Sequence, residues 1–289
     1  MKDNLLHDLL DHLTLEPLRE DRFRGESRSL GGKSVFGGQV LGQALLAADA
    51  TVEGRRAHSL HAYFLLAGDP TAPIVYEVER IRDGRSFATR RVVAVQHGRP
   101  IFNMAVSFQV AEEGLDHHAP MPDVPGPEGL LSGSELHRQI ADHLPESHRE
   151  ALTAERPIEM RPVQPRDLLN PERRPPQRQV WLRTVGTLPD EPALHQAMLA
   201  YASDFTLLAT ALFPHGLSFF NPEVQAVSLD HAMWFHRPFR MDEWLLYAMD
   251  SPSASAGRGL GRGSIFTRDG RLVASVAQEG VIRLRRKDR

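Results

Sequence analysis

The chain presents one order of sequence features twice, once in each half. In each half, a helical stretch of small apolar residues is followed by β-branched and aromatic runs, a turn containing Gly and a last apolar run. These features occupy about residues 36–110 in the first half and 194–280 in the second. A duplicated stretch of this kind is one small domain used twice. Any fold of this chain must therefore hold two similar units within 289 residues.

The pattern of each unit predicts one helix followed by antiparallel strands. Residues 36–53 are rich in Ala, Leu and Gln, with apolar residues spaced at about 3.6, which predicts a helix packed closely enough to need small side chains. From Ala57 to Val110, β-branched runs are separated by turn sequences such as Asp83-Gly84, as in an antiparallel sheet. We expect an α+β fold in which each helix is wrapped by a curved sheet. Two such units, the double hot-dog arrangement, would join edge to edge and leave a ligand cleft between one unit's helix and the other's strands.

Composition also divides the chain into three segments. We assign 1–111 to an N-terminal unit, 112–177 to a linker and 178–289 to a C-terminal unit that carries the candidate catalytic residues. The linker is rich in Pro and charged residues, and a helical pattern from Ser134 to about Glu155 interrupts it. This mixture predicts an ordered bridge with loops rather than a flexible tether.

Charge and residue usage exclude several classes of function. The net charge of -3 gives no global electrostatic attraction to nucleic acid or to an anionic membrane. The chain has no Cys, which excludes disulfides, thiolate metal sites and a Cys nucleophile, and fits a reducing compartment. The N-terminus lacks the apolar run of a signal peptide, and no stretch approaches the roughly 18 apolar residues of a membrane span. We expect a cytoplasmic protein that binds neither nucleic acid nor membrane.

Familiar catalytic and binding motifs are absent or incomplete. Gly32-Lys33-Ser34 resembles the end of a phosphate-binding loop, but Ser27 occupies the position of its required first Gly. The Gly-rich segment 257–263 lacks the strand-to-helix context of a dinucleotide fingerprint and predicts a bulged or ligand-adjacent strand. No Ser lies in a G-x-S-x-G elbow, and the 14 His residues show no metal-ligand spacing. We therefore expect neither a metal site nor a Ser hydrolase triad.

Only the second unit carries polar residues suited to chemistry at matching places: Asp204, Ser228 and Gln278. Asp204 falls on a largely apolar helix face, where burial would raise the pKa of its carboxyl and make it a stronger base. Ser228 opens the strand after the helix, and Gln278 lies in the last strand. A hydroxyl and an amide can each donate and accept a hydrogen bond, so they could hold a water molecule against the carboxylate. The trio therefore predicts a water-activating site.

The same residues also have ordinary structural explanations, which the pattern leaves open. Ser203-Asp204 is a common helix N-cap sequence and could start a second helix running through Leu212. Ser228 could be an ordinary strand hydroxyl. Gln278 could be an exposed side chain on a sheet face.

Long runs of residues carry a resemblance to a known family over nearly the whole chain. The runs are 178–183, Tyr201-Ala202-Ser203-Asp204, 230–239 and Ala277-Gln278-Glu279-Gly280 in the second half, and Val35-Phe36-Gly37-Gly38-Gln39-Val40, His58-Ser59 and Arg82-Asp83-Gly84 in the first. Together they closely resemble acyl-CoA thioesterase II. That family implies a double hot-dog enzyme that hydrolyses fatty acyl-CoA thioesters, often as a homo-oligomer such as a tetramer.

The resemblance also implies roles for individual positions. The family's catalytic Asp falls on Asp204, its hydroxyl residue on Ser228, where some members have Thr, and its Gln on Gln278. We expect an acyl-CoA thioester hydrolase for medium to long chains that releases a free fatty acid and CoA. Coenzyme A would enter as part of the substrate, and no metal or redox cofactor is implied. The linker matches least, so it could tune the chain-length preference.

The mechanism expected from this combination is direct hydrolysis, with Asp204 as general base and the other two residues holding the attacking water. The tetrahedral oxyanion needs hydrogen-bond donors, and backbone N–H groups near a helix start are the usual source. We therefore expect the substrate-binding residues to lie in the first unit, at Gly37, Gly38, Gln39 and His58.

Two other functions would fit the same fold. A hot-dog enoyl-CoA hydratase would bind the same ligand, and Gly68-Asp69-Pro70 resembles the acidic loop of such enzymes, but no nearby His completes an Asp/His pair. A non-enzymatic acyl-CoA sensor would keep the fold without the chemistry. If it controlled transcription it would need a DNA-binding helix pair, which neither the acidic N-terminus nor the Pro-broken linker offers. Thiol release, loss of enoyl absorbance, or binding without either distinguishes the three functions.

Overall fold

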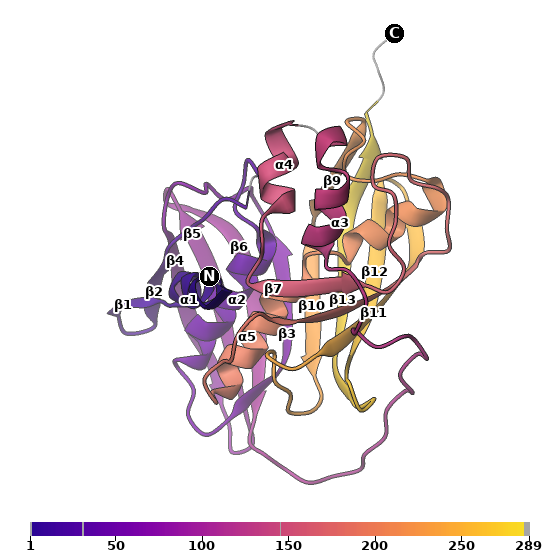
Figure 1. The fold of residues 1–289 in the computed structure, drawn as a ribbon. Coiled ribbons are helices and arrows are strands. Elements are labelled where there is room, and N and C mark those ends of the chain that lie inside the picture. The colour runs from indigo at the N-terminus through magenta and orange to yellow at the C-terminus, as the bar shows by residue number, and fades with distance from the viewer. Residues whose placement is uncertain (1, 31, 145, 286–289) are drawn as a thin grey trace.

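Both units share one continuous antiparallel sheet (Figure 1). The computed structural model describes residues 2–30, 32–144 and 146–285. The strands within these residues are β1 (Glu16–Arg19), β2 (Arg22–Gly25), β3 (Arg56–Phe64), β4 (Ile74–Asp83), β5 (Phe87–Gln96), β6 (Arg99–Gln109), β7 (Ile158–Pro162), β8 (Gln177–Thr184), β9 (Val224–Ser228), β10 (Asp230–Phe235), β11 (Leu245–Ser255), β12 (Arg258–Thr267) and β13 (Leu272–Leu284). Their order in the sheet is β1-β2-β4-β5-β6-β3-β10-β13-β12-β11-β8-β7, and β9 pairs with β13.

The two units join through the antiparallel pairing of β3 with β10. Leu60 of β3 lies opposite Met233 of β10, and His61 lies opposite Ala232. The two sheets therefore meet edge to edge, as the sequence predicts. Pairing the two edge strands with each other also removes an exposed edge from each unit.

Helix α2 (Gly37–Asp49) is the buried helix of the first unit. It packs against β3, β4, β5 and β6, and α1 (Lys2–Leu13) lies on it with Leu6, Leu9 and Leu13 buried. The predicted helix over 36–53 is confirmed, although it ends at Asp49. The expectation of close packing is also met, because the alanines along its length are fully buried: Ala44, Ala47 and Ala48.

Helix α5 (Pro192–Ser203) is the counterpart of α2 in the second unit, and the two helices cross at close range. A Cβ added to Gly38 would lie 2.3 Å from the carbonyl oxygen of Tyr201, and one added to Gly42 would lie 3.1 Å from that of Ala197. Since the residue numbers run in opposite directions, the helices are antiparallel and the start of α2 meets the end of α5. Glycine admits this approach because it has no side chain to separate the backbones.

Beyond α5 the chain continues as the 3₁₀ helix η2 (Leu208–His215), which packs on β11, β12 and β13. The Gly-rich segment lies under it in β12, and its pairing with β13 is regular from Arg258 to Ile265. A Cβ added to Gly261 would lie 3.0 Å from the carbonyl oxygen of Leu207. The predicted bulge is thus wrongly placed: it lies in β11, between Asp250 and Ser253. The glycines of β12 instead let η2 pack closely on the sheet.

The linker is ordered, as predicted. It forms α3 (Gly133–Gln139), the 3₁₀ turn η1 (Ala141–His143) and α4 (Glu146–Thr153), and α3 and α4 pack against each other (Figure 1). The prediction of one helix from Ser134 to about Glu155 is wrong, because the chain leaves helical geometry at Ile140 (φ -115°, ψ 16°). Strand β7 of the linker also pairs with β8, so the sheet of the second unit begins before residue 178.

Candidate active site

Asp204, Ser228 and Gln278 meet at one point of the second unit. The side-chain Nε2 of Gln278 donates to Asp204 Oδ1 at 2.5 Å and to Ser228 Oγ at 3.0 Å. Ser228 Oγ donates to Asp204 Oδ1 at 3.5 Å. The three residues lie at the end of α5, at the end of β9 and in β13, and the β9–β13 pairing places Ser228 opposite Gly280. The structure therefore brings the predicted trio together.

The ordinary explanations for these residues do not fit the structure. Asp204 is the C-cap residue of α5 rather than the start of another helix, and η2 begins only after Leu207, with no side-chain cap. Gln278 is fully buried rather than exposed on a sheet face. Ser228 is bonded to both of the others rather than being an isolated strand hydroxyl. Their polar groups are directed at one another.

The surroundings make Asp204 a stronger base than an ordinary Asp. Burial raises the pKa of its carboxyl, and hydrogen bonds from Gln278, from the Gly38 backbone N–H and from Ser228 offset part of that rise. Asp204 and Ser228 keep partial solvent exposure, so water can reach the carboxylate. Gln278 Oε1 is buried and has no hydrogen-bond partner among the described residues. One water molecule can donate to this oxygen and to the carboxylate at the same time.

The sequence analysis missed the residues that hold Asp204 in place. Ser203 Oγ donates to Ala200 O at 2.9 Å and lies 2.9 Å from Nε2 of the fully buried His231. The Tyr247 hydroxyl donates to Ser203 O at 3.1 Å. Burial lowers the pKa of His231 to about 3, so its ring is neutral, and its Nε2–H must donate to Ser203, whose own proton is already used. The alternation of β10 was the available signal, since it puts His231 on the same face as the core residue Met233.

The start of α2, from the first unit, completes the site. The Gly38 N–H donates to the Asp204 carboxylate. A Cβ added to Gly37 would lie 2.7 Å from Asp204 Oδ2 and 2.9 Å from the Phe64 ring. N–H groups in the first turn of a helix have no acceptor within the helix and carry partial positive charge. The candidate site therefore lies between the units, with the carboxylate from one and a helix start from the other.

Gln39 and His58, which the sequence analysis expects to bind substrate, are not brought to the trio. Gln39 Nε2 donates to Glu26 O at 3.0 Å, and its Oε1 accepts from the Arg28 N–H at 3.4 Å, so this side chain fastens the segment before α2. His58 Nε2 lies 2.8 Å from Ser107 Oγ, and its ring packs edge-on against exposed Phe87. Both side chains are engaged elsewhere.

The acidic loop considered for a hydratase does have a His partner, contrary to the sequence analysis. His97 Nε2 lies 3.0 Å from Asp69 Oδ2. Hydrogen bonds from Thr71 and then His97 hold the pKa of Asp69 at about 2, and both members of the pair are exposed. A surface carboxylate that is such a weak base is poorly suited to take a proton at neutral pH. The pair fastens a surface turn rather than forming a second site.

The structure also bears on metal and membrane binding. Among the residues that the structure describes, no group of three or more His, Asp or Glu side chains is placed to hold a metal ion. One segment, Pro192–His215, is long and apolar enough to cross a membrane by length and composition. It comprises α5 and η2, and 72% of its most apolar window is buried inside the protein. It is therefore a core segment of the second unit.

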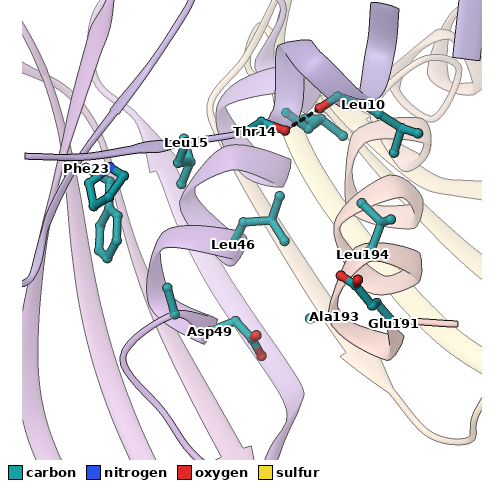
Figure 2. A pocket seen from close by; sticks show the side chains of 12 residues that line it. Leu10, Thr14, Leu15, Phe23, Leu46, Asp49, Glu191, Ala193 and Leu194 are labelled. Atoms are coloured by element: carbon teal, nitrogen blue, oxygen red, sulfur yellow. Dashed lines mark hydrogen bonds between the residues drawn. The ribbon is translucent and has the colours of Figure 1, made fainter. Parts of the chain in front are cut away.

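A cavity of about 450 Å³ lies at the other end of the α2–α5 pair (Figure 2). Its lining is mostly apolar and includes Phe23 of β2, Leu46 of α2 and Leu194 of α5. Asp49, the last residue of α2, also lines it, and burial raises the pKa of its carboxyl to about 6. No side chain of the described residues donates a hydrogen bond to this carboxylate. It is a buried acid without the partners of Asp204.

Known proteins similar to this chain are thioesterases. Two family models match, "Acyl-CoA thioesterase" over residues 147–281 and "Acyl-CoA thioesterase N-terminal domain" over 26–109. Acyl-CoA thioesterase 2 of Haemophilus influenzae is 42% identical over 281 residues, which cover 97% of this chain and 98% of that protein. The crystal structure of acyl-CoA thioesterase II TesB2 from Mycobacterium marinum is 46% identical, with a TM-score of 0.78 over 95% of this chain and 97% of that one.

A more distant solved structure bears on the fold alone. The hot-dog-fold protein of unknown function from Alicyclobacillus acidocaldarius is 19% identical, with a TM-score of 0.76 over 96% of this chain and 98% of that one. The predicted hot-dog arrangement, with two units in one chain, is confirmed by this match together with the two helices and their shared sheet.

Proposed function

The chain belongs to the acyl-CoA thioesterase II family, and we propose that it hydrolyses acyl-CoA of medium to long chain length with Asp204 as general base. The family's reaction converts an acyl-CoA and water to a free acid and coenzyme A, and this chain is a hydrolase of that class. The observation that carries the mechanism is the hydrogen-bonded set of Asp204, Gln278 and Ser228, with Gln278 Oε1 left as a free acceptor among the described residues.

The attacking water is held by two acceptors. It donates one O–H to the Asp204 carboxylate and the other to Gln278 Oε1, so that its lone pair can face the thioester carbonyl carbon. The raised pKa of Asp204 makes it a better proton acceptor at neutral pH. General-base assistance of this kind supplies about 10²–10⁴ in rate. Ser228 and Gln278 Nε2 both bond Oδ1 and thereby fix the plane of the carboxylate.

The residues at the site can complete the reaction without a metal or redox cofactor. Asp204 takes a proton from water as the water oxygen bonds to the carbonyl carbon. When the tetrahedral intermediate collapses, the C–S bond breaks and Asp204 returns that proton to the departing thiolate. Coenzyme A therefore enters as part of the substrate and leaves as a thiol, and the acyl group leaves as a free fatty acid.

The first turn of α2 supplies the donors for the oxyanion. Gly38 already donates its N–H to Asp204, and Gly37 precedes it beside the same carboxylate. An N–H in this turn has no acceptor within the helix, and the helix dipole favours negative charge there. We assign Gly37 as the main oxyanion donor, with Gly38 orienting the base.

Aromatic side chains beside the trio provide the apolar wall that an acyl chain needs. The ring of Phe36 stacks on that of Phe205 at 4.5 Å between centroids and lies edge-on to Tyr201 at 5.3 Å. Phe64 borders Gly37. Burial of each methylene against such a wall contributes about 0.8 kcal/mol, so longer chains bind more tightly until the wall ends.

The test is thiol release from acyl-CoA substrates of increasing chain length by the purified protein. We expect release to increase from short to medium and long chains. Release that is fastest with acetyl-CoA would contradict the chain-length assignment. Loss of enoyl absorbance without thiol release would indicate a hydratase, and saturable binding without either would indicate a sensor.

We also propose that copies of the chain associate and that the protein acts in the cytoplasm. Tyr63 of β3 and Trp234 of β10, at the centre of the sheet, are 59% and 37% exposed. Exposed aromatic side chains are enriched at protein interfaces. Light scattering of the purified protein should give a multiple of the 32.3 kDa chain mass, and fractionated cells should hold it in the soluble fraction. A monomer, or recovery with membranes, would contradict the respective proposal.

A further inference from the structure

Three arginines near the trio have no acidic partner. No carboxylate lies within ion-pair distance of Arg166, Arg174 or Arg178 among the described residues. Burial and then Arg174 lower the pKa of Arg166, and burial together with Arg166 lowers the pKa of Arg178 to about 10. The guanidinium groups are thus close enough to repel one another. We refer to these three residues as the arginine cluster.

The arginine cluster lies beside the segment that runs from Asp204 through η2. Arg178 of β8 lies opposite Met249 of β11, and Met249 Sδ accepts a hydrogen bond from the Thr206 hydroxyl at 3.3 Å. Arg166 lies over the Phe213 ring at 4.4 Å, near the end of η2, and the Arg174 N–H donates to Phe213 O. The eight residues of η2 span about 16 Å at a rise of about 2 Å per residue. Arg166 and Arg174 therefore lie at the end of η2 that is farther from Asp204, and Arg178 starts from the strand beside the beginning of η2.

Backbone carbonyls orient two of the guanidinium groups and leave other donors open. Arg166 Nη2 donates to Glu172 O at 3.1 Å, and Arg174 Nη1 donates to Pro165 O at 3.1 Å. Arg166 Nε is buried without a partner among the described residues, and the side chain of Arg178 donates no hydrogen bond to any of them. All three side chains keep partial exposure, so a ligand can reach them.

The neighbourhood adds further positive groups. Arg156, at the end of the linker helices, lies over the Phe205 ring at 5.7 Å, directly after Asp204. Arg156 and Arg178 both lower the pKa of His137 on α3, after the larger effect of burial. In a chain with a net charge of -3, this concentration of cations is a local feature of one face of the second unit. Partly buried cations repel one another, and an anionic ligand would relieve that repulsion.

We propose that Arg166, Arg174 and Arg178 bind the phosphate groups of coenzyme A while its thioester lies at Asp204. The proposal rests on the acyl-CoA hydrolysis proposed above. A guanidinium presents several N–H donors in a plane and binds phosphate oxygens in pairs, which a single backbone amide cannot do. The pantetheine arm separates the diphosphate from the sulfur, and η2 provides a surface of matching length between the two. The linker, which supplies Arg166 and Arg174, thereby binds the phosphate groups that all acyl-CoA molecules share.

The test compares two substrates that share an acyl group but differ in phosphate content. Acyl-CoA carries the phosphates, and the acyl-pantetheine thioester does not. In Arg178→Gln and Arg166→Gln, the ratio of kcat/KM for acyl-CoA to that for acyl-pantetheine should fall on the order of tenfold, since a charge-assisted hydrogen bond is lost. The matched control is Arg91→Gln, an exposed arginine of β5 that pairs with Glu79 in the first unit, and it should leave this ratio unchanged.

A binding measurement tests recognition of the phosphates separately from catalytic turnover. Adenosine 3′,5′-bisphosphate, which has the 3′-phosphate and the inner 5′-phosphate of coenzyme A without the thioester, should inhibit the wild type competitively and the Arg178→Gln variant on the order of tenfold more weakly. Raised salt should weaken its inhibition of the wild type more than that of the variant. Thermal melting should show Arg178→Gln at least as stable as the wild type, because the change removes an uncompensated charge.

The outcomes distinguish this proposal from the one on which it rests. If the wild type releases thiol from neither substrate, the proposed function fails. If it cleaves both and the variants keep the wild-type ratio, the cluster does not bind the phosphates. A variant that loses activity equally on both substrates and melts earlier would show that these arginines serve only to pack η2.

Discussion

The two ends of the α2–α5 pair carry the same kind of acid but differ in what surrounds it. Since the helices are antiparallel, Asp204 after α5 meets the start of α2, and Asp49 at the end of α2 meets the start of α5 (Figure 2). Burial raises the pKa of both carboxyls, that of Asp49 to about 6. Only Asp204 has Gln278 and Ser228 to align it. Desolvation alone therefore produces a perturbed acid, and alignment by partners is what makes a site.

The lack of an amide partner in the first unit can be traced to one position of the sheet. In each unit the last hairpin has a bulge near its turn, immediately before Phe102 in β6 and immediately before Ala274 in β13. Four residues further along lie Val106 in the first unit and Gln278 in the second. Both side chains are buried, at 1% and 0% exposure. The first unit thus has an apolar core residue where the second has the amide that donates to Asp204.

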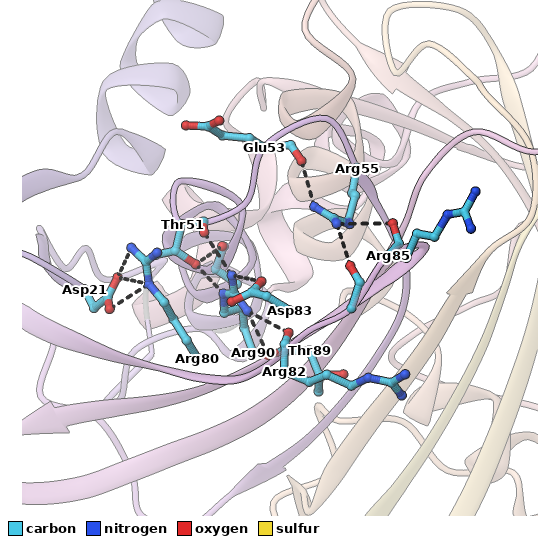
Figure 3. A network of polar contacts seen from close by, with 12 residues as sticks. Asp21, Thr51, Glu53, Arg55, Arg80, Arg82, Asp83, Arg85, Thr89 and Arg90 are labelled. Atoms are coloured by element: carbon cyan, nitrogen blue, oxygen red, sulfur yellow. Dashed lines mark hydrogen bonds and ion pairs between the residues drawn. The ribbon is translucent and has the colours of Figure 1, made fainter.

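The strand beside this position also differs between the units, and Figure 3 shows its polar contacts in the first unit. Val106 lies opposite Arg90, whose buried guanidinium donates to Thr51 Oγ1 at 2.8 Å and to Asp83 Oδ1 at 2.6 Å. The Arg90 guanidinium thus connects the chain just after α2 to the β4–β5 hairpin. Gln278 lies opposite Gly261, which leaves room for Leu207 and lets the chain go on as η2. At this position the first unit has a buried guanidinium, and the second unit has a glycine.

The largest expected difference between the ends is in catalysis. Asp204→Asn should lower kcat by about 10²-fold or more, because the amide cannot take a proton from water. Asp49→Asn is the matched control and should keep the wild-type kcat. Thiol release by the two folded variants is the measurement. Equal losses in both, or none in either, would contradict the assignment of the base.

Replacing Gln278, whose amide aligns the Asp204 carboxylate, tests whether burial alone makes Asp204 an effective base. Gln278→Val gives the second unit the residue type of Val106 and should lower kcat by about 10²-fold, since the water loses one acceptor and the carboxylate loses one donor. Gln109→Val, at the end of β6 where the side chain only reaches Glu112 near the surface, is the control. A Gln278→Val enzyme with wild-type kcat would show that Asp204 needs no partner.

The close crossing of the helices should be sensitive to one methyl group. In Gly38→Ala, the new Cβ would start 2.3 Å from Tyr201 O, so α2 and α5 must separate. We expect a loss of about 1–3 kcal/mol in the free energy of unfolding, with lower activity because Gly38 also orients Asp204. Gly114→Ala, with open space around it, should change neither. Denaturant unfolding measures the effect, and equal stability of the two variants would show that the crossing adapts.

The smallest effect concerns stability against pH at the Asp49 end. Its folded pKa of about 6 is above the ordinary Asp value of 3.8, so between these values the folded state binds more protons than the unfolded state. Stability should therefore fall as the pH rises from about 4 to about 6 and stay lower above that range. Asp49→Asn should remove this dependence and stabilise the protein at pH 7 by at most about 3 kcal/mol, less with solvent screening. Urea titrations at pH 4.5 and pH 7 would detect it, and parallel changes in wild type and variant would contradict it.

The parts of the fold that follow from local pattern could be predicted. The helix at 37–49 and the strands after it have the spacing of apolar residues that helices and sheets require. The splitting of the linker helix at Ile140 and the joining of β7 to the sheet were missed, because a change of backbone geometry at one residue and an edge pairing leave little trace in apolar spacing. The Asp69–His97 pair was missed for a similar reason, since the two residues lie 28 positions apart and meet only across a turn.

The sequence by itself determined that this chain holds two copies of one unit and that only the second carries a carboxylate, a hydroxyl and an amide at matching places. The resemblance to a family gave those three residues their expected roles. Only the tertiary structure decided which other groups join them: Gly38 does, whereas the side chains of Gln39 and His58 turn to other partners. The physical reason is that periodicity fixes which face a side chain occupies, while the helix crossing and the β3–β10 pairing fix which faces meet.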